Sequence, residues 1–223
     1  MSTVNIQTFI KFGSEENIRD LQENGTIYCN TIEYFRQLED SYLRGDSYEG
    51  TFKITNYPPD SKITLYLPDK KEIELKTAKL HLREFYTDIK GNIYCLTAIT
   101  REEIIKLETL KLDLKNSRFG THFLLIKDNQ QFFDRLMKGF ENEKLSIKTG
   151  FVKYYDKHLI NGELDLFHKS KEFEYQKEFR IIVKNDRQNP IKFQIGSLKE
   201  ISEIFETKDL ETLVCQYNPQ HRV

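Results

Sequence analysis

One stretch near the C-terminal end constrains the fold of this chain most, because polar and apolar side chains alternate along residues 173–184. Successive side chains of a β-strand point to opposite faces, so this alternation predicts a strand with one packed face. Lys177 breaks the apolar set, which consists of Phe173, Tyr175, Phe179, Ile181 and Val183. We expect the other elements to be organised around this strand.

The opposite face of the predicted strand is polar, with Gln176 and Glu178 two residues apart. On one face they would be neighbours about 6–7 Å apart. In the functional interpretation, a carboxylate beside an amide orients a sugar hydroxyl and stabilises developing positive charge. In the structural interpretation, Glu178 pairs with Arg180 or with a neighbouring strand on a solvated face. The spacing alone favours the structural interpretation and leaves the functional one open.

Length and composition favour one domain of mixed structure. The chain has 223 residues and no linker-like segment, and it is long enough to bury a sizeable core, so we expect a single domain over residues 1–223. Its 16 Phe and 12 Tyr favour strands, and helical patterns occur between the strand patterns. We therefore predict an α+β fold of mostly antiparallel sheets with flanking helices.

Charge and cysteine content exclude several classes of protein. The formal net charge of −1 argues against a broad nucleic-acid-binding surface, although a local basic groove remains open. The sparse cysteines Cys29, Cys95 and Cys215 argue for a reducing compartment and against a disulfide framework or zinc site. Neither a signal peptide nor a membrane-spanning apolar run is evident, so we expect a cytoplasmic protein with no membrane partner.

The N-terminal region predicts a compact unit of alternating strands and helices. Residues 5–12 alternate as a strand, and Ser14 is placed to cap the helix that Gly25 ends. Residues 26–30 form a short strand pattern, and Thr31 opens a second helix.

A long polar loop follows over Glu39–Gly50, where Arg44 lies between Tyr42 and Tyr48. Arginine with aromatic rings suits a phosphate and a flat ring, so one interpretation places this loop at the rim of a ligand cleft. The alternative is a solvated connection, since long loops are often merely mobile.

Residues 51–99 are rich in strand patterns separated by turn chemistry. We predict an antiparallel meander that packs on the strand over 173–184. The five strands are expected at Thr51–Thr55, Ile63–Leu67, Ile73–Leu75, Leu80–Phe85 and Ile93–Ile99.

The remaining elements follow from shorter patterns. Helices are expected at Arg101–Leu107, after a cap at Asp128 or Asn129, and from Ser197 to Ile204. Strands are expected at Thr121–Lys127, Leu145–Tyr155, Ile191–Ile195 and Thr212–Cys215, with a loop over His158–Lys171. Ile191–Ile195 should pair with the strand over 173–184 across the turn between them.

Two weaker patterns concern metals and histidines. Asp60 and Glu74 at adjacent strand ends could hold Mg²⁺ while Lys76 steadies an attacking water, a nuclease-like arrangement that also arises by chance in a highly charged chain. The histidines are scattered without metal-ligand spacing. His122 alone stands out, because it begins an apolar strand beside Gly120.

Several separated pieces match a known layout in order. They are residues 9–12 (Phe-Ile-Lys-Phe), 25–31 (Gly-Thr-Ile-Tyr-Cys-Asn-Thr), 91–97 (Gly-Asn-Ile-Tyr-Cys-Leu-Thr), 119–125 (Phe-Gly-Thr-His-Phe-Leu-Leu), 152–154 (Val-Lys-Tyr) and 171–180 (Lys-Glu-Phe-Glu-Tyr-Gln-Lys-Glu-Phe-Arg). Together they resemble a widespread, poorly characterised family of bacterial domains, some linked to phage defence. The layout is also similar to the ADP-ribosyltransferase fold.

That resemblance implies an enzyme acting on NAD as an ADP-ribosyltransferase or a glycohydrolase. It places Lys11 on the ribose or a phosphate, Thr97 as the central hydroxyl, and Gln176 and Glu178 as the late catalytic pair. Cleaving the nicotinamide glycosidic bond develops oxocarbenium charge, which a carboxylate stabilises. The expected site therefore has Glu178, Gln176 and Thr97 as catalytic residues. The expected cofactor-binding residues are Lys11, Arg44, Tyr48 and His122.

Other classes of function remain open. The same scaffold could be a non-catalytic domain that senses a nucleotide or binds a partner, and the Mg²⁺ nuclease is a third hypothesis. If the chain transfers ADP-ribose, the acceptor is a protein or a nucleic acid.

Overall fold

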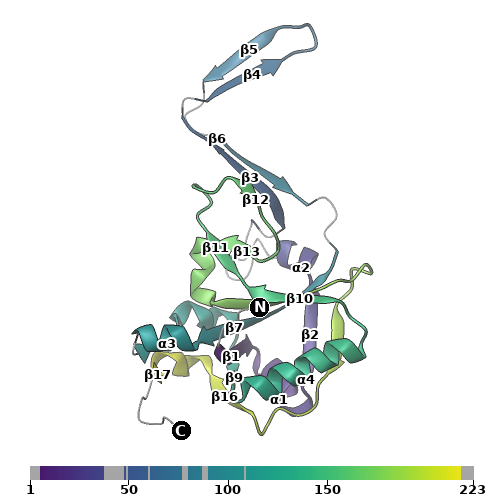
Figure 1. Cartoon of the computed structure of the whole chain (residues 1–223), viewed down its shortest axis with the longest axis vertical. Helices are drawn as coiled ribbons and strands as arrows, with labels where there is room; N and C mark the ends of the chain where they lie inside the picture. The colour runs from purple at the N-terminus through teal and green to yellow at the C-terminus, as the bar shows by residue number, and fades with distance from the viewer. Residues whose placement is uncertain are drawn as a thin grey trace.

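The fold is built on one large antiparallel sheet with helices packed against it (Figure 1). This computed structural model describes residues 6–37, 48, 50–59, 61–76, 80–86, 90–107 and 109–216. The sheet runs in the order β10-β14-β7-β1-β9-β16, and β2 joins β7 and carries β15. Its strands are β1 (Ile6–Gly13), β2 (Thr26–Thr31), β7 (Asn92–Thr100), β9 (His122–Ile126), β10 (Ile147–Phe151), β14 (Glu178–Val183), β15 (Ile191–Gln194) and β16 (Ser202–Glu206).

Helices cover this sheet and confirm the predicted α+β class. They are α1 (Glu15–Asn24), α2 (Ile32–Gln37), α3 (Arg101–Leu107) and α4 (Asn129–Asn142), with the 3₁₀ helices η2 (Leu114–Phe119), η3 (Lys171–Gln176) and η4 (Thr207–Glu211). No helix among the described residues combines the length and the apolar character that a membrane span requires.

The main core lies where α1 and α4 pack on one face of the sheet. Phe9 of β1 contacts the rings of Phe132 and Phe179 at centroid distances of 5.9 and 5.3 Å. Ile10, next to Phe9, points to the other face and joins a second cluster with Ile99. Fully burying each such side chain contributes about 1.5–3 kcal/mol.

The predicted helix signals are confirmed at both main helices. Ser14 accepts a hydrogen bond from the backbone N–H of Asn17, and Asp128 does the same for Gln131. Gly25 ends α1 with φ 65°, a left-handed conformation that glycine adopts without strain. A Cβ there would lie 2.1 Å from the Gly196 carbonyl oxygen, so the close approach of the two segments also requires glycine.

Two strands, β1 and β2, share one edge of β7 and leave a gap between them, and we call this gap the split in the sheet. The candidate site lies at this split. β14 pairs with one edge of β7, so β1 and β2 share the other edge. β1 pairs there as far as the Ile10↔Thr97 pair, and β2 begins only at Asn30↔Ile93. Residues 94–96 therefore lie between the two partners, where β1 and β2 diverge.

A long two-stranded ribbon leaves the body of the molecule (Figure 1). Its base consists of β3 (Thr51–Tyr57) and β6 (Leu80–Phe85), and its far end consists of β4 (Lys62–Tyr66) and β5 (Glu72–Lys76). The predicted strands exist, but the meander is wrong, because β3 pairs with β6 around the inner β4–β5 hairpin. Of this region, β7 alone pairs with β14 among the described residues. The base instead pairs with β12 (Gly162–Glu163).

The strand predicted over 173–184 is wrong in its first half. Residues 171–176 form η3, and Lys177 then takes a left-handed φ of 46° before β14 begins at Glu178. Tyr175 stacks on Phe119 from the 3₁₀ helix, at 6.5 Å between ring centroids. Tyr175, which is partly buried, thus packs on a neighbouring segment without being part of a strand.

Four predictions for the C-terminal part of the chain are also corrected. β15 pairs with β2 rather than with β14, because β10 and β7 already occupy both edges of β14. The helix expected from Ser197 to Ile204 is replaced by β16, which pairs with the outer edge of β9. The last strand, β17 (Cys215–Gln216), is short and pairs with β8 (Thr109–Leu110). The expected loop over 158–171 contains β12 and β13 (His168–Ser170), and β13 pairs in parallel with β11 (Lys153–Tyr155).

Candidate functional site

A cavity of about 650 Å³ lies at the split between β1 and β2. The end of β1 and the start of α1 contribute to one wall, and β2 and α2 contribute to another. Residues 94–97 of β7 line the cavity between them, together with groups from η3 and β14. This size is typical of sites for small molecules and cofactors. Four of the residues predicted from the sequence line it: Lys11, Thr97, Gln176 and Glu178.

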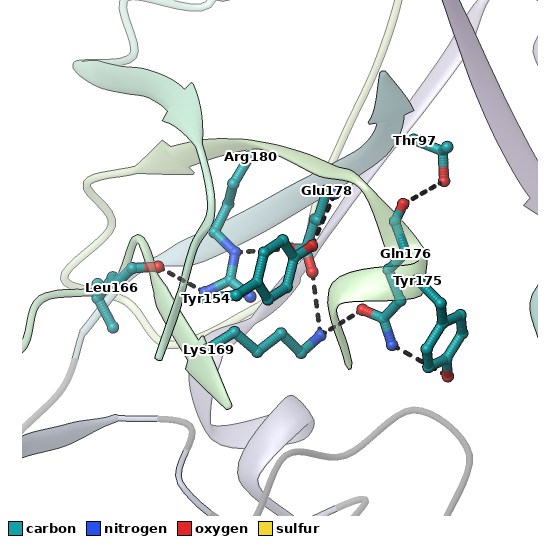
Figure 2. Close-up of polar contacts among 8 residues, drawn as sticks. All are labelled: Thr97, Tyr154, Leu166, Lys169, Tyr175, Gln176, Glu178 and Arg180. Atoms are coloured by element: carbon teal, nitrogen blue, oxygen red, sulfur yellow. Dashed lines mark hydrogen bonds and ion pairs between the residues drawn. The ribbon is translucent and has the colours of Figure 1, made fainter. Parts of the chain in front are cut away.

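Glu178, at the start of β14, is 5% exposed and both its carboxylate oxygens are paired (Figure 2). Arg180 Nε donates to Oε1 at 2.7 Å, and Lys169 Nζ donates to Oε2 at 3.0 Å. Burial alone would raise the pKa of this carboxyl, but the charges of Arg180 and Lys169 hold it well below its ordinary value. Glu178 is therefore a fixed anion in a clamp of two cations.

Gln176 reaches the same cluster by a route that the sequence did not predict. It belongs to η3, so it does not share a strand face with Glu178, and that prediction is wrong. Its side-chain oxygen accepts from Lys169 Nζ at 2.7 Å. Lys169 thus connects the amide and the carboxylate that we expected to be direct neighbours (Figure 2).

The buried cluster is held on its other sides by neighbouring segments. Arg180 is 2% exposed, and its Nη1 donates to the carbonyl of Leu166. The backbone N–H of Glu178 donates to the hydroxyl of Tyr154 at 2.9 Å. Burial and the charge of Glu178 raise the pKa of Tyr154, so this hydroxyl stays neutral. These contacts hold the carboxylate in one position.

Thr97 lies directly opposite Glu178 in the β7–β14 pair. It is 7% exposed, and its hydroxyl donates to the backbone carbonyl of Gln176 at 2.9 Å (Figure 2). This bond ties the end of η3 to β7. The hydroxyl lines the cavity, but its proton is already engaged with the backbone.

Lys11 spans the split in the sheet. Peptide groups alternate between the two edges of a strand, and Ala98 N–H donates to Lys177 on the β14 side. The Cys95 peptide therefore faces the split, and Lys11 Nζ donates to its carbonyl at 2.7 Å. The ammonium also lies 4.3 Å from the centroid of the Tyr94 ring. Lys11 thus supplies positive charge to the cavity lining.

The rest of the lining is aromatic and polar. Tyr34 is 42% exposed and meets Phe35 edge-to-face at 5.6 Å, so aromatic surface borders the opening on the α2 side. Among the described lining residues there are four cations and two carboxylates: Lys11, Lys169, Arg180 and Lys192, with Asp20 and Glu178. The lining therefore has an excess of two positive charges, which favours an anionic ligand.

The other predicted cofactor residues lie elsewhere. Tyr48 is at the base of the ribbon, where its hydroxyl contacts His81 at 3.2 Å and its ring lies under Arg83 at 4.5 Å. His122 contacts Thr121 and is not among the described side chains that line the cavity, although its strand partner Gly13 is. Arg44 lies outside the described residues, as does most of the loop around it.

The nuclease hypothesis gains no support. Asp60 lies outside the described residues, and Glu74 lies on the exposed β4–β5 hairpin, 3.4 Å from Lys62. Of Lys76 the structure describes the backbone alone. No group of three or more potential His, Cys, Asp or Glu metal ligands occurs in the described part of the chain.

Sequence reasoning missed Lys169, Tyr94 and Asp20. Lys169 falls in a stretch without periodicity that we assigned to a loop, so its burial had no sequence signal. Tyr94 has the pattern of an ordinary strand residue, and Asp20 that of a solvated helix position.

A comparison of the chain with family models, curated proteins and solved structures finds no match in any of the three.

Proposed function

We propose that the cavity binds a nucleotide and that the protein acts as a nucleotide-binding module. The observation that carries this proposal is the combination of surplus positive charge, aromatic surface and an open strand edge around one cavity of about 650 Å³. Cationic groups suit phosphates, and aromatic rings suit a base. NAD is the first ligand to test, because of the resemblance to ADP-ribosyltransferases.

Binding is favoured over turnover by the state of Glu178. A carboxylate that stabilises an oxocarbenium must face the sugar, whereas both oxygens of Glu178 are engaged by Arg180 and Lys169. The hydroxyl of Thr97 is likewise engaged with the backbone. The polar atoms of Glu178 and Thr97 therefore bind other parts of the protein and stabilise the cavity wall, and they are not directed at a substrate.

NAD glycohydrolysis or ADP-ribosyl transfer remains the second candidate. It is favoured by one observation, that an ionised carboxylate and an amide, Glu178 and Gln176, line the same cavity. In this case Lys169 would release one oxygen of Glu178 when NAD enters, and a protein or a nucleic acid would be the acceptor of any transferred ADP-ribose. A role in bacterial phage defence belongs to the same resemblance.

Thermal melting with and without NAD, together with chromatography of the same samples, separates the two candidates. A nucleotide-binding module should melt at a higher temperature as the NAD concentration rises, while the NAD remains intact. Release of nicotinamide that disappears in Glu178→Gln would favour the enzyme. Both candidates would be contradicted if NAD, ADP and ATP all left the melting temperature unchanged and no NAD was consumed.

A further inference from the structure

A chain of hydrogen-bonded side chains lies at the base of the ribbon. Asn56 of β3 and His81 of β6 are direct partners in the β3–β6 pair, and Tyr48 lies just before β3. The hydroxyl oxygen of Tyr48 is 3.2 Å from His81 Nε2, and His81 Nδ1 is 2.8 Å from Asn56 Oδ1. None of the three is among the described residues that line the cavity. The ribbon therefore holds a hydroxyl, an imidazole and an amide in contact at a second place in the molecule.

The amide of Asn56 fixes the direction of these hydrogen bonds. Its Nδ2 donates to two backbone carbonyls, that of Lys157 at 3.0 Å and that of Ile160 at 2.7 Å. The reversed amide would bring its oxygen against both carbonyl oxygens, so Oδ1 must face His81. Because Oδ1 accepts, Nδ1 of His81 carries the ring proton. Nε2 of the neutral ring is then an acceptor, and the hydroxyl of Tyr48 donates to it.

A hydroxyl paired in this way has the arrangement of an activated nucleophile. The imidazole can take the hydroxyl proton while the oxygen attacks, and the amide holds the ring in the tautomer that accepts this proton. Tyrosine is one of the residues that form covalent intermediates in enzymes. Tyr48 and His81 are both partly exposed, so the pair lies near the surface and not in the core.

Cationic groups next to Tyr48 indicate the class of substrate. Arg83 Cζ lies 4.5 Å and Lys157 Nζ lies 5.4 Å from the centroid of its ring. Lys157 also pairs with Glu172 at 2.9 Å. Guanidinium and ammonium groups bind phosphoryl oxygens and stabilise the charge that develops on them during attack. These surroundings favour a phosphate ester over an uncharged carboxylic ester.

We infer that Tyr48 is a nucleophile for phosphodiesters, with His81 as the general base and Asn56 as a positioning residue. The Tyr48 oxygen bonds to phosphorus while its proton passes to His81 Nε2. One ester P–O bond breaks, and His81 returns the proton to the departing oxygen, so an alcohol leaves. Water then attacks the phosphorus with His81 again taking the proton, and the Tyr48–phosphorus bond breaks. This second step releases a phosphomonoester and restores the Tyr48 hydroxyl.

The test incubates the full chain with bis(p-nitrophenyl) phosphate. We expect release of p-nitrophenol and a nitrophenyl-phosphoryl adduct that peptide mapping by mass spectrometry locates on Tyr48. Tyr48→Phe keeps the ring beside the cations and should lose both signals, and His81→Gln should slow the release about 10²-fold or more. Tyr66→Phe removes a ribbon hydroxyl that is exposed, and as the matched control it should keep both signals. Thermal melting of each variant verifies that it is folded.

The role of Asn56 has a separate readout in the tautomer of His81. Nitrogen-15 NMR of the histidine rings should show the Nδ1–H tautomer for His81 in the parent, with His81→Gln identifying its signals. Asn56→Ala should shift His81 toward the Nε2–H tautomer and slow the release of p-nitrophenol. A loss of packing alone would not change the tautomer in this direction.

Several results would overturn the inference. They are a parent protein that neither releases p-nitrophenol nor forms the adduct, an adduct that persists in Tyr48→Phe, and an Nε2–H tautomer of His81 in the parent. Acetylation of Tyr48 by p-nitrophenyl acetate without reaction with the phosphodiester would show acyl transfer instead and make the phosphodiester assignment wrong. Nucleotide binding by the cavity is tested by other residues and ligands, so the two proposals can fail independently.

Discussion

Lys169 Nζ lies 3.0 Å from a carboxylate oxygen of Glu178 and 2.7 Å from the side-chain oxygen of Gln176. A buried ammonium therefore joins a carboxylate on β14 to an amide on η3. Since Arg180 occupies the other oxygen of Glu178, the cavity wall contains two cations for one anion. The cost of burying each of these charged or polar groups is offset by its contacts with the others.

Replacing Lys169 with methionine should destabilise the fold by about 2–4 kcal/mol, because it removes one partner from a buried ion pair and leaves Gln176 without its donor. Urea unfolding of the variant and the parent measures the difference. Lys171→Met, at an exposed position two residues away, is the control and should change stability by less than about 0.5 kcal/mol. Equal stability of Lys169→Met and the parent would contradict the buried pair.

Thr97→Val should cost about 1–3 kcal/mol, because the carbonyl of Gln176 loses its donor in a buried place. Thr97→Ser keeps the hydroxyl and should recover most of that loss. Thermal and urea unfolding of both variants provide the measurement. If Thr97→Ser is as destabilising as Thr97→Val, keeping the hydroxyl does not restore stability, which would contradict the hydrogen bond to Gln176 as the cause.

The pH dependence of stability should reveal the lowered pKa of Glu178. Its ordinary pKa is 4.5, and the folded value lies well below it. The unfolded chain therefore takes up the proton first as the pH falls, so the stabilisation is complete above about pH 5 and declines below it. We expect the stability difference between the parent and Glu178→Gln to shrink between pH 6 and pH 3 in urea titrations. Glu203→Gln, an exposed control, should show no such trend, and a constant difference for Glu178→Gln would contradict the clamp.

Removing the far hairpin of the ribbon should leave the body stable. β4 and β5 pair with each other, and none of their side chains belongs to the three described core clusters. Replacing residues 62–76 with a short turn should therefore shift the melting temperature by no more than a few degrees. Ile54 is a fully buried residue at the base of the ribbon, so Ile54→Ala should instead cost about 2–4 kcal/mol. A large loss of stability on removing the hairpin would mean that it packs on the body in solution.

Local signals in the sequence predicted the elements that local chemistry determines. The cap at Ser14 and the stop at Gly25 predicted both ends of α1, and the cap expected at Asp128 or Asn129 predicted the start of α4. Pairing partners were predicted less well, because alternation shows that a strand exists and not which edge it meets. β15 could pair with β14 or β2 on its pattern alone, and the occupied edges of β14 decide for β2.

Four residues expected at the site lie around one cavity, but the geometry expected for Gln176 and Glu178 is wrong. Lys11, Thr97, Gln176 and Glu178 meet at one cavity, and their functional roles stay predictions. Lys177 adopts a left-handed conformation, which a lysine in the sequence does not indicate. The pattern therefore could not show that the strand begins only at Glu178 and that Gln176 lies outside it. The contacts of Lys169 with Glu178 and Gln176 depend on the path of a segment that has no hydrophobic periodicity, so the sequence pattern could not predict them.

The central claim is that this cavity binds a nucleotide with Lys11 facing its phosphates. Calorimetric titration of NAD and ADP into the parent protein, Lys11→Met and the exposed control Lys127→Met tests it most directly. We predict saturable binding at one site, about tenfold weaker in Lys11→Met and unchanged in Lys127→Met, as expected for the loss of one charged contact. No heat of binding in the parent, or the same affinity in Lys11→Met as in the parent, would contradict the claim.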